Sequence, residues 1–166
     1  MLSLKLLEDK IIKEKYIKVS EDTIPNVGKE YSITFEIKFT PIGPPEKWKH
    51  ISSEDIEFFL DKLTEHIKAT YPVSGGRRVF SLLKNTTLEP YYGVRIYYTI
   101  DSKMTATLRD FWEEMKWIEL TTYNYNSINL SSPEFFLVQY PSYWWIWLIL
   151  SGVSIGTIIA IIKRKK

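Results

Sequence analysis

The sequence contains no cysteine among its 166 residues. Disulfide bonds, thiolate zinc sites, iron–sulfur clusters and cysteine nucleophiles are therefore excluded. The absence of cysteine, with abundant isoleucine, lysine, glutamate and tyrosine, fits a thermophilic source, although an AT-rich genome produces the same bias.

Histidine is nearly as scarce, because only His50 and His66 occur, in different segments. Glu65 directly precedes His66, whereas two metal ligands on one helix face need a separation of three or four residues. Acidic residues on the predicted helices are interpreted as solvated faces, and no arrangement of a catalytic pair is visible. We therefore expect no metal, no cofactor and no catalytic residue.

A strongly basic surface is also missing. The formal net charge is +2, from 22 Lys and Arg against 20 Asp and Glu. Four of the cations are the last four residues, so residues 1–143 hold 18 cations against 20 anions, a net charge of −2. Nucleic-acid-binding proteins usually carry a dense basic patch. We therefore expect no nucleic-acid partner.

What is present is a long uncharged run near the C-terminus. Residues 144–162 contain no charged side chain, and four basic residues follow. About 20 apolar residues are needed to cross a hydrocarbon core of about 30 Å. We therefore predict a transmembrane helix over 141–162. The predicted membrane-interface residues are aromatic at one end and basic at the other: Tyr140, Tyr143, Trp144, Trp145, Trp147, Lys163, Arg164, Lys165 and Lys166.

The same run has a face of small residues. Gly152, Gly156 and Ala160 recur at every fourth position. Small side chains at this spacing let the backbone of another helix approach closely. The spacing predicts packing against other transmembrane subunits or a second copy, although a lipid-facing glycine face is the alternative.

The positions of the basic residues predict an orientation. Four cations follow the run, whereas Glu134 is the only charge between Asn124 and Tyr143. By the positive-inside rule the tail is cytoplasmic, so we predict a single-pass membrane protein with an extracytoplasmic domain. The N-terminus holds no apolar stretch long enough for a signal peptide, so a tail-anchored protein with a cytosolic domain is the alternative.

The order of the predicted elements indicates an α+β fold. Residues 31–40 alternate apolar and polar side chains without an error, which predicts a strand with one buried face. A capping box formed by Ser52 and Asp55 precedes apolar residues at helical spacing up to Pro72, which predicts a helix. The further predicted elements are strands over 77–84, 91–100, 117–123 and 134–140 and a helix over 105–116.

The β-α-β-β-α-β order favours a ferredoxin-like antiparallel sheet. The alternative is a β-sandwich with inserted helices, since long strands and proline-rich links also suit that class. The predicted parts are an N-terminal extension over 1–30, expected to be a hairpin, an α+β soluble domain over 31–140, the transmembrane helix over 141–162 and a basic tail over 163–166.

One loop is a candidate anion-binding site. In Gly75-Gly76-Arg77-Arg78, flexible backbone meets adjacent positive charge, which suits a phosphate or carboxylate. The segment lacks the P-loop lysine and the dinucleotide-binding fingerprint, so a turn that enters a strand is the simpler interpretation. The tyrosines of residues 91–98 are interpreted as core and cross-strand packing rather than a base-stacking platform.

The sequence therefore favours a single-pass, membrane-anchored, non-catalytic accessory or structural subunit. The larger assembly could be a membrane enzyme complex, a surface apparatus or a membrane-containing virus particle. Its expected partners are the lipid bilayer and other transmembrane subunits or copies of itself. The alternative is a membrane-tethered binding module that takes a peptide or small ligand, for example by strand addition to a sheet edge. An enzyme with a cryptic site is a third hypothesis.

Overall fold

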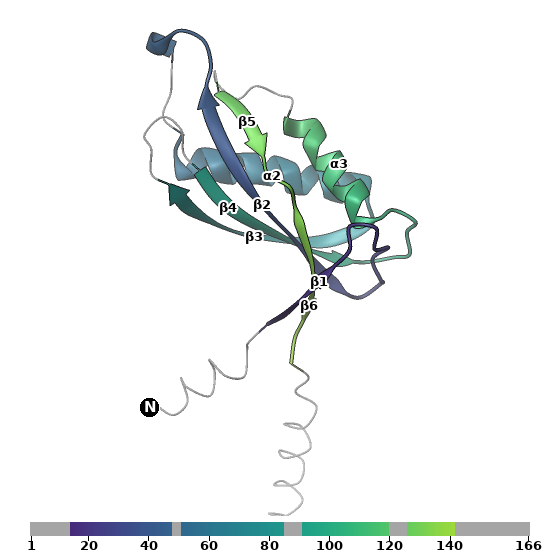
Figure 1. Cartoon of the computed structure of the whole chain (residues 1–166). Coiled ribbons are helices and arrows are strands. Elements are labelled where there is room, and N and C mark those ends of the chain that lie inside the picture. The colour runs from purple at the N-terminus through teal and green to yellow at the C-terminus, as the bar shows by residue number, and fades with distance from the viewer. Residues whose placement is uncertain (1–13, 48–50, 85–90, 120–125, 142–166) are drawn as a thin grey trace, which may run out of the picture. The chain divides into compact units, whose positions relative to one another are not determined.

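The computed structural model describes residues 14–47, 51–84, 91–119 and 126–141 (Figure 1). The chain divides into two compact units, Tyr16–Val138 and a second unit formed by Met1–Lys15 and Gln139–Lys166. Nearly all of the described residues belong to the first unit.

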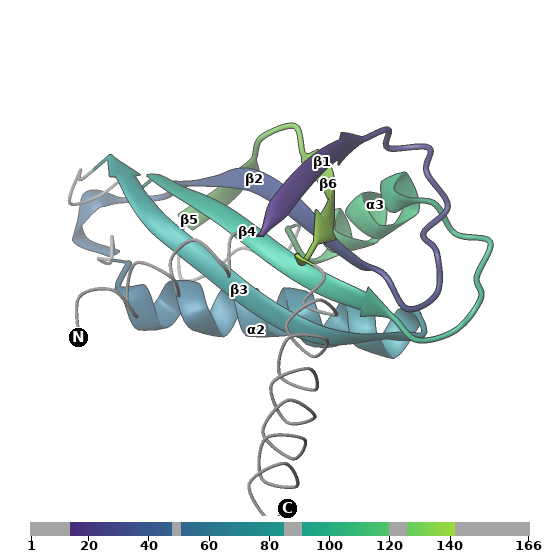
Figure 2. The same ribbon diagram turned by 90° about the horizontal axis from the view of Figure 1, so that it is seen from below.

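The first unit is built on one six-stranded sheet with the strand order β1-β6-β2-β4-β3, while β5 pairs with β2. Helices α2 and α3 pack on one face of this sheet (Figure 2). The strands are β1 (Lys15–Val19), β2 (Glu30–Pro41), β3 (Val73–Lys84), β4 (Tyr91–Ile100), β5 (Asn126–Leu130) and β6 (Glu134–Gln139), and the helices are the 3-10 helix η1 (Pro45–Lys47), α2 (Ser53–Thr70) and α3 (Leu108–Glu119).

Strand β2 is the central strand, because it pairs antiparallel with three others. It meets β4 along one side, whereas β6 and β5 share its other side, opposite residues 30–34 and 37–41. The chain order β2-α2-β3-β4-α3-β6 with these neighbours is that of a split βαβ sheet. The first strand, β1, comes from the N-terminal extension and pairs with β6, not with β2.

The predicted alternation of β2 is confirmed. Side chains at every second position point to the helices and are almost completely buried, because a strand sends successive side chains to opposite faces. These residues are Tyr31, Ile33, Phe35, Ile37 and Phe39. They form one core with the apolar faces of both helices.

Both helices begin at a capping box. In α2 the Ser52 hydroxyl accepts from the backbone N–H of Asp55, and the Asp55 carboxylate accepts from the backbone N–H of Ser52, as predicted. In α3, Thr107 and Asp110 make the same reciprocal pair. These hydrogen bonds from Thr107 lower the pKa of the Asp110 carboxyl group.

Two predicted boundaries were wrong. Residues 117–119 were expected to begin a strand, but they are the last residues of α3. Strand β3 was expected to begin after the two glycines, but it begins at Val73 and passes through Gly75 and Gly76 at a bulge. Both glycines have positive φ, and a Cβ atom on Gly76 would lie 2.3 Å from Cγ2 of Thr64 in α2. Glycine therefore lets β3 continue close to the helix.

The α+β class is compatible with the structure, but the fold prediction was wrong in its C-terminal transmembrane helix. No helix among the described residues is long and apolar enough to cross a membrane. Helix α2 has 18 residues but carries one polar face, and α3 has only 12. Apart from Pro141, the predicted span over 141–162 lies outside the described residues. The predicted single-pass membrane localisation, in either topology, is corrected for the same reason.

The alternative of a β-sandwich does not describe this unit either. Its described strands join a single sheet, and helices rather than a second sheet cover the buried face. Neither α2 nor α3, the two α-helices that the structure describes, lies on the opposite face of the sheet (Figure 2). We call this face the open face.

Candidate functional site on the open face of the sheet

The open face carries aromatic, basic and hydroxyl side chains from neighbouring strands. Thr34 of β2 lies opposite Arg95 of β4, and Ser32 lies opposite Tyr97. On the other side of β2, Ser32 lies opposite Phe136 of β6. We call Tyr16 of β1, Thr34, Arg95, Tyr97 and Phe136 the open-face cluster.

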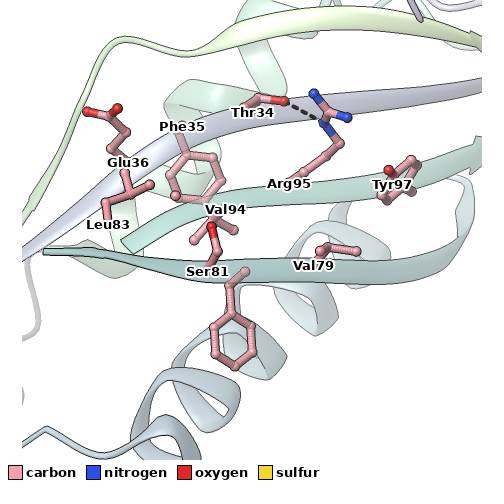
Figure 3. A pocket seen from close by; sticks show the side chains of 11 residues that line it. Thr34, Phe35, Glu36, Val79, Ser81, Leu83, Val94, Arg95 and Tyr97 are labelled. Atoms are coloured by element: carbon pink, nitrogen blue, oxygen red, sulfur yellow. Dashed lines mark hydrogen bonds between the residues drawn. The ribbon is translucent and has the colours of Figure 1, made fainter. Parts of the chain in front are cut away.

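Arg95 holds this cluster together. Its Cζ atom lies 4.3 Å from the ring centroid of Tyr16 and 5.6 Å from that of Phe136. Its Nε–H donates to the Thr34 hydroxyl over 2.9 Å (Figure 3). Cation–π attraction and the hydrogen bond therefore fix a partly buried guanidinium. Among the described residues, no carboxylate forms an ion pair with it.

The aromatic rings of the cluster pack against one another. The hydroxyl groups of Tyr16 and Tyr97 lie 2.7 Å apart, and the edge of the Tyr16 ring meets Phe136. Tyr97 is only 3 % exposed, and the hydroxyl of Ser32 is buried without a hydrogen-bond partner. These rings therefore tie β1, β6 and β4 together, which is the packing role that we expected for Tyr97.

A hollow of about 320 Å³ opens beside Arg95 between β2, β4 and β3 (Figure 3). Its rim includes Thr34, Glu36, Val79, Ser81, Leu83 and Arg95. Gly93 contributes no side chain, and a Cβ atom there would lie 3.4 Å from Cδ1 of Leu83. The hollow therefore combines one cation, one carboxylate, hydroxyl-bearing residues and an apolar side.

Glu36 is the acidic group of the hollow. Its carboxylate accepts a hydrogen bond from the Tyr91 hydroxyl, and its backbone N–H donates to the Ser131 hydroxyl. The hydrogen bond to Glu36 raises the pKa of Tyr91. Glu134, which lies opposite Thr34 on β6, forms an ion pair with Lys18 at 2.6 Å.

Strand β3 ends the sheet beside this hollow and exposes apolar side chains. Val79, Leu82 and Leu83 are 53, 46 and 51 % exposed. Register shifts interrupt the pairing of β3 with β4 before Arg78 and after Leu82. The regular pairing therefore runs over the five residues from Arg78 to Leu82. We call residues 79–83, which include the displaced Leu83, the β3 edge.

The predicted anion-binding residues take different partners. The Arg77 guanidinium lies over the Tyr97 ring, with Cζ 3.8 Å from its centroid, whereas Arg78 pairs with Asp61 of α2. Their role in anion binding stays a prediction.

The remaining predicted site residues are mostly outside the described residues. These are Gly152, Gly156 and Ala160 of the helix-packing face and all of the interface residues except Tyr140, whose side chain is exposed. His50 also lies outside, and His66 joins α2 to α3 through a contact of 2.6 Å with Glu114. In the described part of the chain, no three His, Asp or Glu side chains gather as a metal site.

Sequence reasoning missed both the open-face cluster and the β3 edge. The available signal was the alternation itself, which places Thr34 and Arg95 on the faces of their strands away from the core. Whether these two side chains meet depends on which strands are neighbours and on the register of their pairing. Comparison with known proteins adds no further guide, since no protein-family model, curated protein or solved structure matches the chain.

Proposed function

We propose that this chain is a non-catalytic protein-interaction module that takes up an extended segment of a partner protein along the β3 edge. The observation that carries this proposal is the group of three half-exposed apolar residues on the last strand of the sheet. An edge strand presents unpaired backbone N–H and C=O groups, which can pair with another chain. Side chains of the added strand would then pack on Val79, Leu82 and Leu83.

The two bulges limit what can be added. Bulges commonly protect sheet edges, because they twist the strand away from regular pairing. Here the first shift precedes the apolar residues, and the second displaces Leu83, the last of them. The added segment is therefore short, about five residues, and depends on side-chain contacts as well as backbone pairing.

Charge on β3 favours a partner other than a second copy. The strand contains Arg77, Arg78 and Lys84 and no acidic residue, and Asp61 of α2 pairs with Arg78. If two copies paired antiparallel about the β3 edge, an arginine of each would lie opposite Lys84 of the other, and like charges directly opposite destabilise a strand pair. An apolar segment with acidic flanks is the complementary partner.

The titratable groups support a non-catalytic role. Burial raises the pKa of Tyr71, Tyr92 and Tyr98, and the hydrogen bond to Glu36 raises that of Tyr91. These shifts move the tyrosines away from neutral pH, where a general acid or base works best. The lowered pKa of Asp110 belongs to a helix cap and not to a cleft.

The proposal is tested with the full chain and a short synthetic peptide that alternates valine and threonine between pairs of aspartates. Bound peptide should slow amide hydrogen exchange within residues 79–83, and replacing aspartate by lysine should weaken binding at least about tenfold. Failure to slow exchange there, or equal binding of the two peptides, would overturn the proposal.

Two variants locate the binding surface. Val79→Glu and Leu82→Glu should each weaken binding of the acidic peptide by about tenfold or more, because they remove apolar contact and repel the aspartates. Ile24→Glu is the matched control, since Ile24 is 52 % exposed in a loop between β1 and β2. If Ile24→Glu weakened peptide binding as much as the β3 variants do, the peptide would not bind specifically at the β3 edge.

A further inference from the structure

We infer that the hollow beside Arg95 is a second binding site, for a small monocarboxylate with an apolar body. This site does not depend on the β3 edge as a docking strand, although Val79 and Leu83 border both. Arg95 would hold the carboxylate, and the apolar side of the hollow would receive the rest of the ligand.

The first argument is that Arg95 has N–H donors beyond the one that binds Thr34. A guanidinium has five N–H donors, and the contact with Thr34 uses the one on Nε. The planar end of the group suits bidentate binding of a carboxylate. Among the described residues, Arg95 has no acidic partner, although it is partly buried. Attraction to an opposite charge is stronger for a partly buried charge than for a fully exposed charge, because less water screens it.

The second argument is that Arg95 is held in place before any ligand arrives. Tyr16, Phe136 and Thr34 contact it from three different strands. A flexible arginine would lose conformational freedom on binding, and this arrangement reduces that cost. Figure 3 shows Arg95 and Thr34 on one side of the hollow, and Val79 and Ser81 on the other.

The third argument is the missing side chain at Gly93. Leu83 is the residue displaced by the register shift at the end of β3, and it lies on the same face as Gly93. Because Gly93 has no side chain, the hollow extends between Leu83 and Arg95. Its volume of about 320 Å³ lies at the lower end of the range of ligand pockets, about 300 to 1,000 Å³, so the ligand is small.

The neighbouring charges select a single negative charge on the ligand. Glu36 also borders the hollow, and Glu134 lies beyond Thr34, where Lys18 pairs with it. Arg95 is the cation that lines the hollow, so it can balance a monoanion, whereas a doubly charged phosphate would meet repulsion from Glu36. A monocarboxylate therefore fits the site better than a phosphate.

The test is an NMR titration of the full chain with hexanoate, hexanamide and inorganic phosphate as probes. Hexanoate should shift the amide signals of Thr34, Gly93 and Arg95, and hexanamide and phosphate should bind at least about tenfold more weakly. Equal binding of hexanoate and hexanamide, or shifts that map away from these residues, would overturn the inference. Tighter binding of phosphate would refute the ligand class.

Two variants separate a ligand-binding Arg95 from one that only joins the strands. Arg95→Gln should abolish the hexanoate shifts. Gly93→Val leaves Arg95 and its aromatic contacts in place but fills the hollow, so it should weaken hexanoate by about fivefold or more. Arg109→Gln changes an arginine that pairs with Glu21 and Asp22 away from the hollow, so it should leave the affinity unchanged. If Gly93→Val bound hexanoate as tightly as the unchanged chain, the hollow would not be the binding site. This result would hold even if Arg95→Gln disturbed the fold.

Discussion

The two faces of the sheet differ in chemistry although the same strands build both. Phe35 and its apolar neighbours on β2 meet the helices, whereas Thr34 and Glu36, which alternate with them, lie on the open face. The covered face is a continuous apolar core. The open face combines a fixed arginine, packed tyrosines and a hollow. We propose that the covered face supplies stability and that the open face and the β3 edge carry recognition.

The largest expected difference between the two faces is in the free energy of unfolding. Phe35 is 2 % exposed, and its ring centroid lies 5.1 Å from that of Trp112. Phe35→Ala should lower the free energy of unfolding by about 3–5 kcal/mol, because it removes apolar contact and leaves a cavity. Val79→Ala on the β3 edge should change it by less than about 1 kcal/mol. Denaturant titration measures both, and similar losses would remove the distinction between the faces.

A smaller difference is expected between two glycines. Gly76 faces α2 at a φ of +93°, with Thr64 in the space of a Cβ atom, whereas Gly93 meets only the flexible end of Leu83. Gly76→Ala should cost about 1–3 kcal/mol through strain, and Gly93→Ala should be close to neutral. Thr64→Ser should recover part of the loss in Gly76→Ala, because it removes the methyl group that blocks the Cβ atom. No recovery would show that the close approach to α2 does not cause the loss.

The smallest effect is a dependence on pH at the start of α3. The pKa of Asp110 in the folded state is lowered from its ordinary value of 3.8 by the hydrogen bonds from Thr107. The ionised form therefore stabilises the fold above pH 3.8, and this contribution is lost as the pH falls through the lower folded-state pKa. Asp110→Asn should make the denaturant midpoint less dependent on pH in this range. An unchanged pH profile would contradict the cap's contribution.

Local patterns in the sequence predicted much of the covered face. Alternation in β2 and the capping box of α2 depend on neighbours within a few residues, so they are visible without the fold. The continuation of β3 through Gly75 and Gly76 was missed, because it depends on how closely the strand approaches Thr64. The open-face cluster was missed because it joins Tyr16, Arg95 and Phe136, which are far apart in the sequence and meet only in the correct strand order.

The transmembrane prediction failed for a related reason. It rested on the hydropathy of residues 141–162 and not on any contact with the rest of the chain. None of the helices that the structure describes has the length and apolar surface to cross a bilayer. Proposals about function therefore depend on the residues of the sheet and not on that segment.

The central claim is that recognition takes place at the β3 edge and that the covered face is structural. Amide hydrogen exchange of the full chain, with and without the aspartate-flanked peptide, tests it most directly. The account predicts slower exchange at residues 79–83 and unchanged exchange along β2, whose partners on both sides are already in place. Unchanged exchange at the β3 edge while the peptide binds elsewhere would contradict the claim.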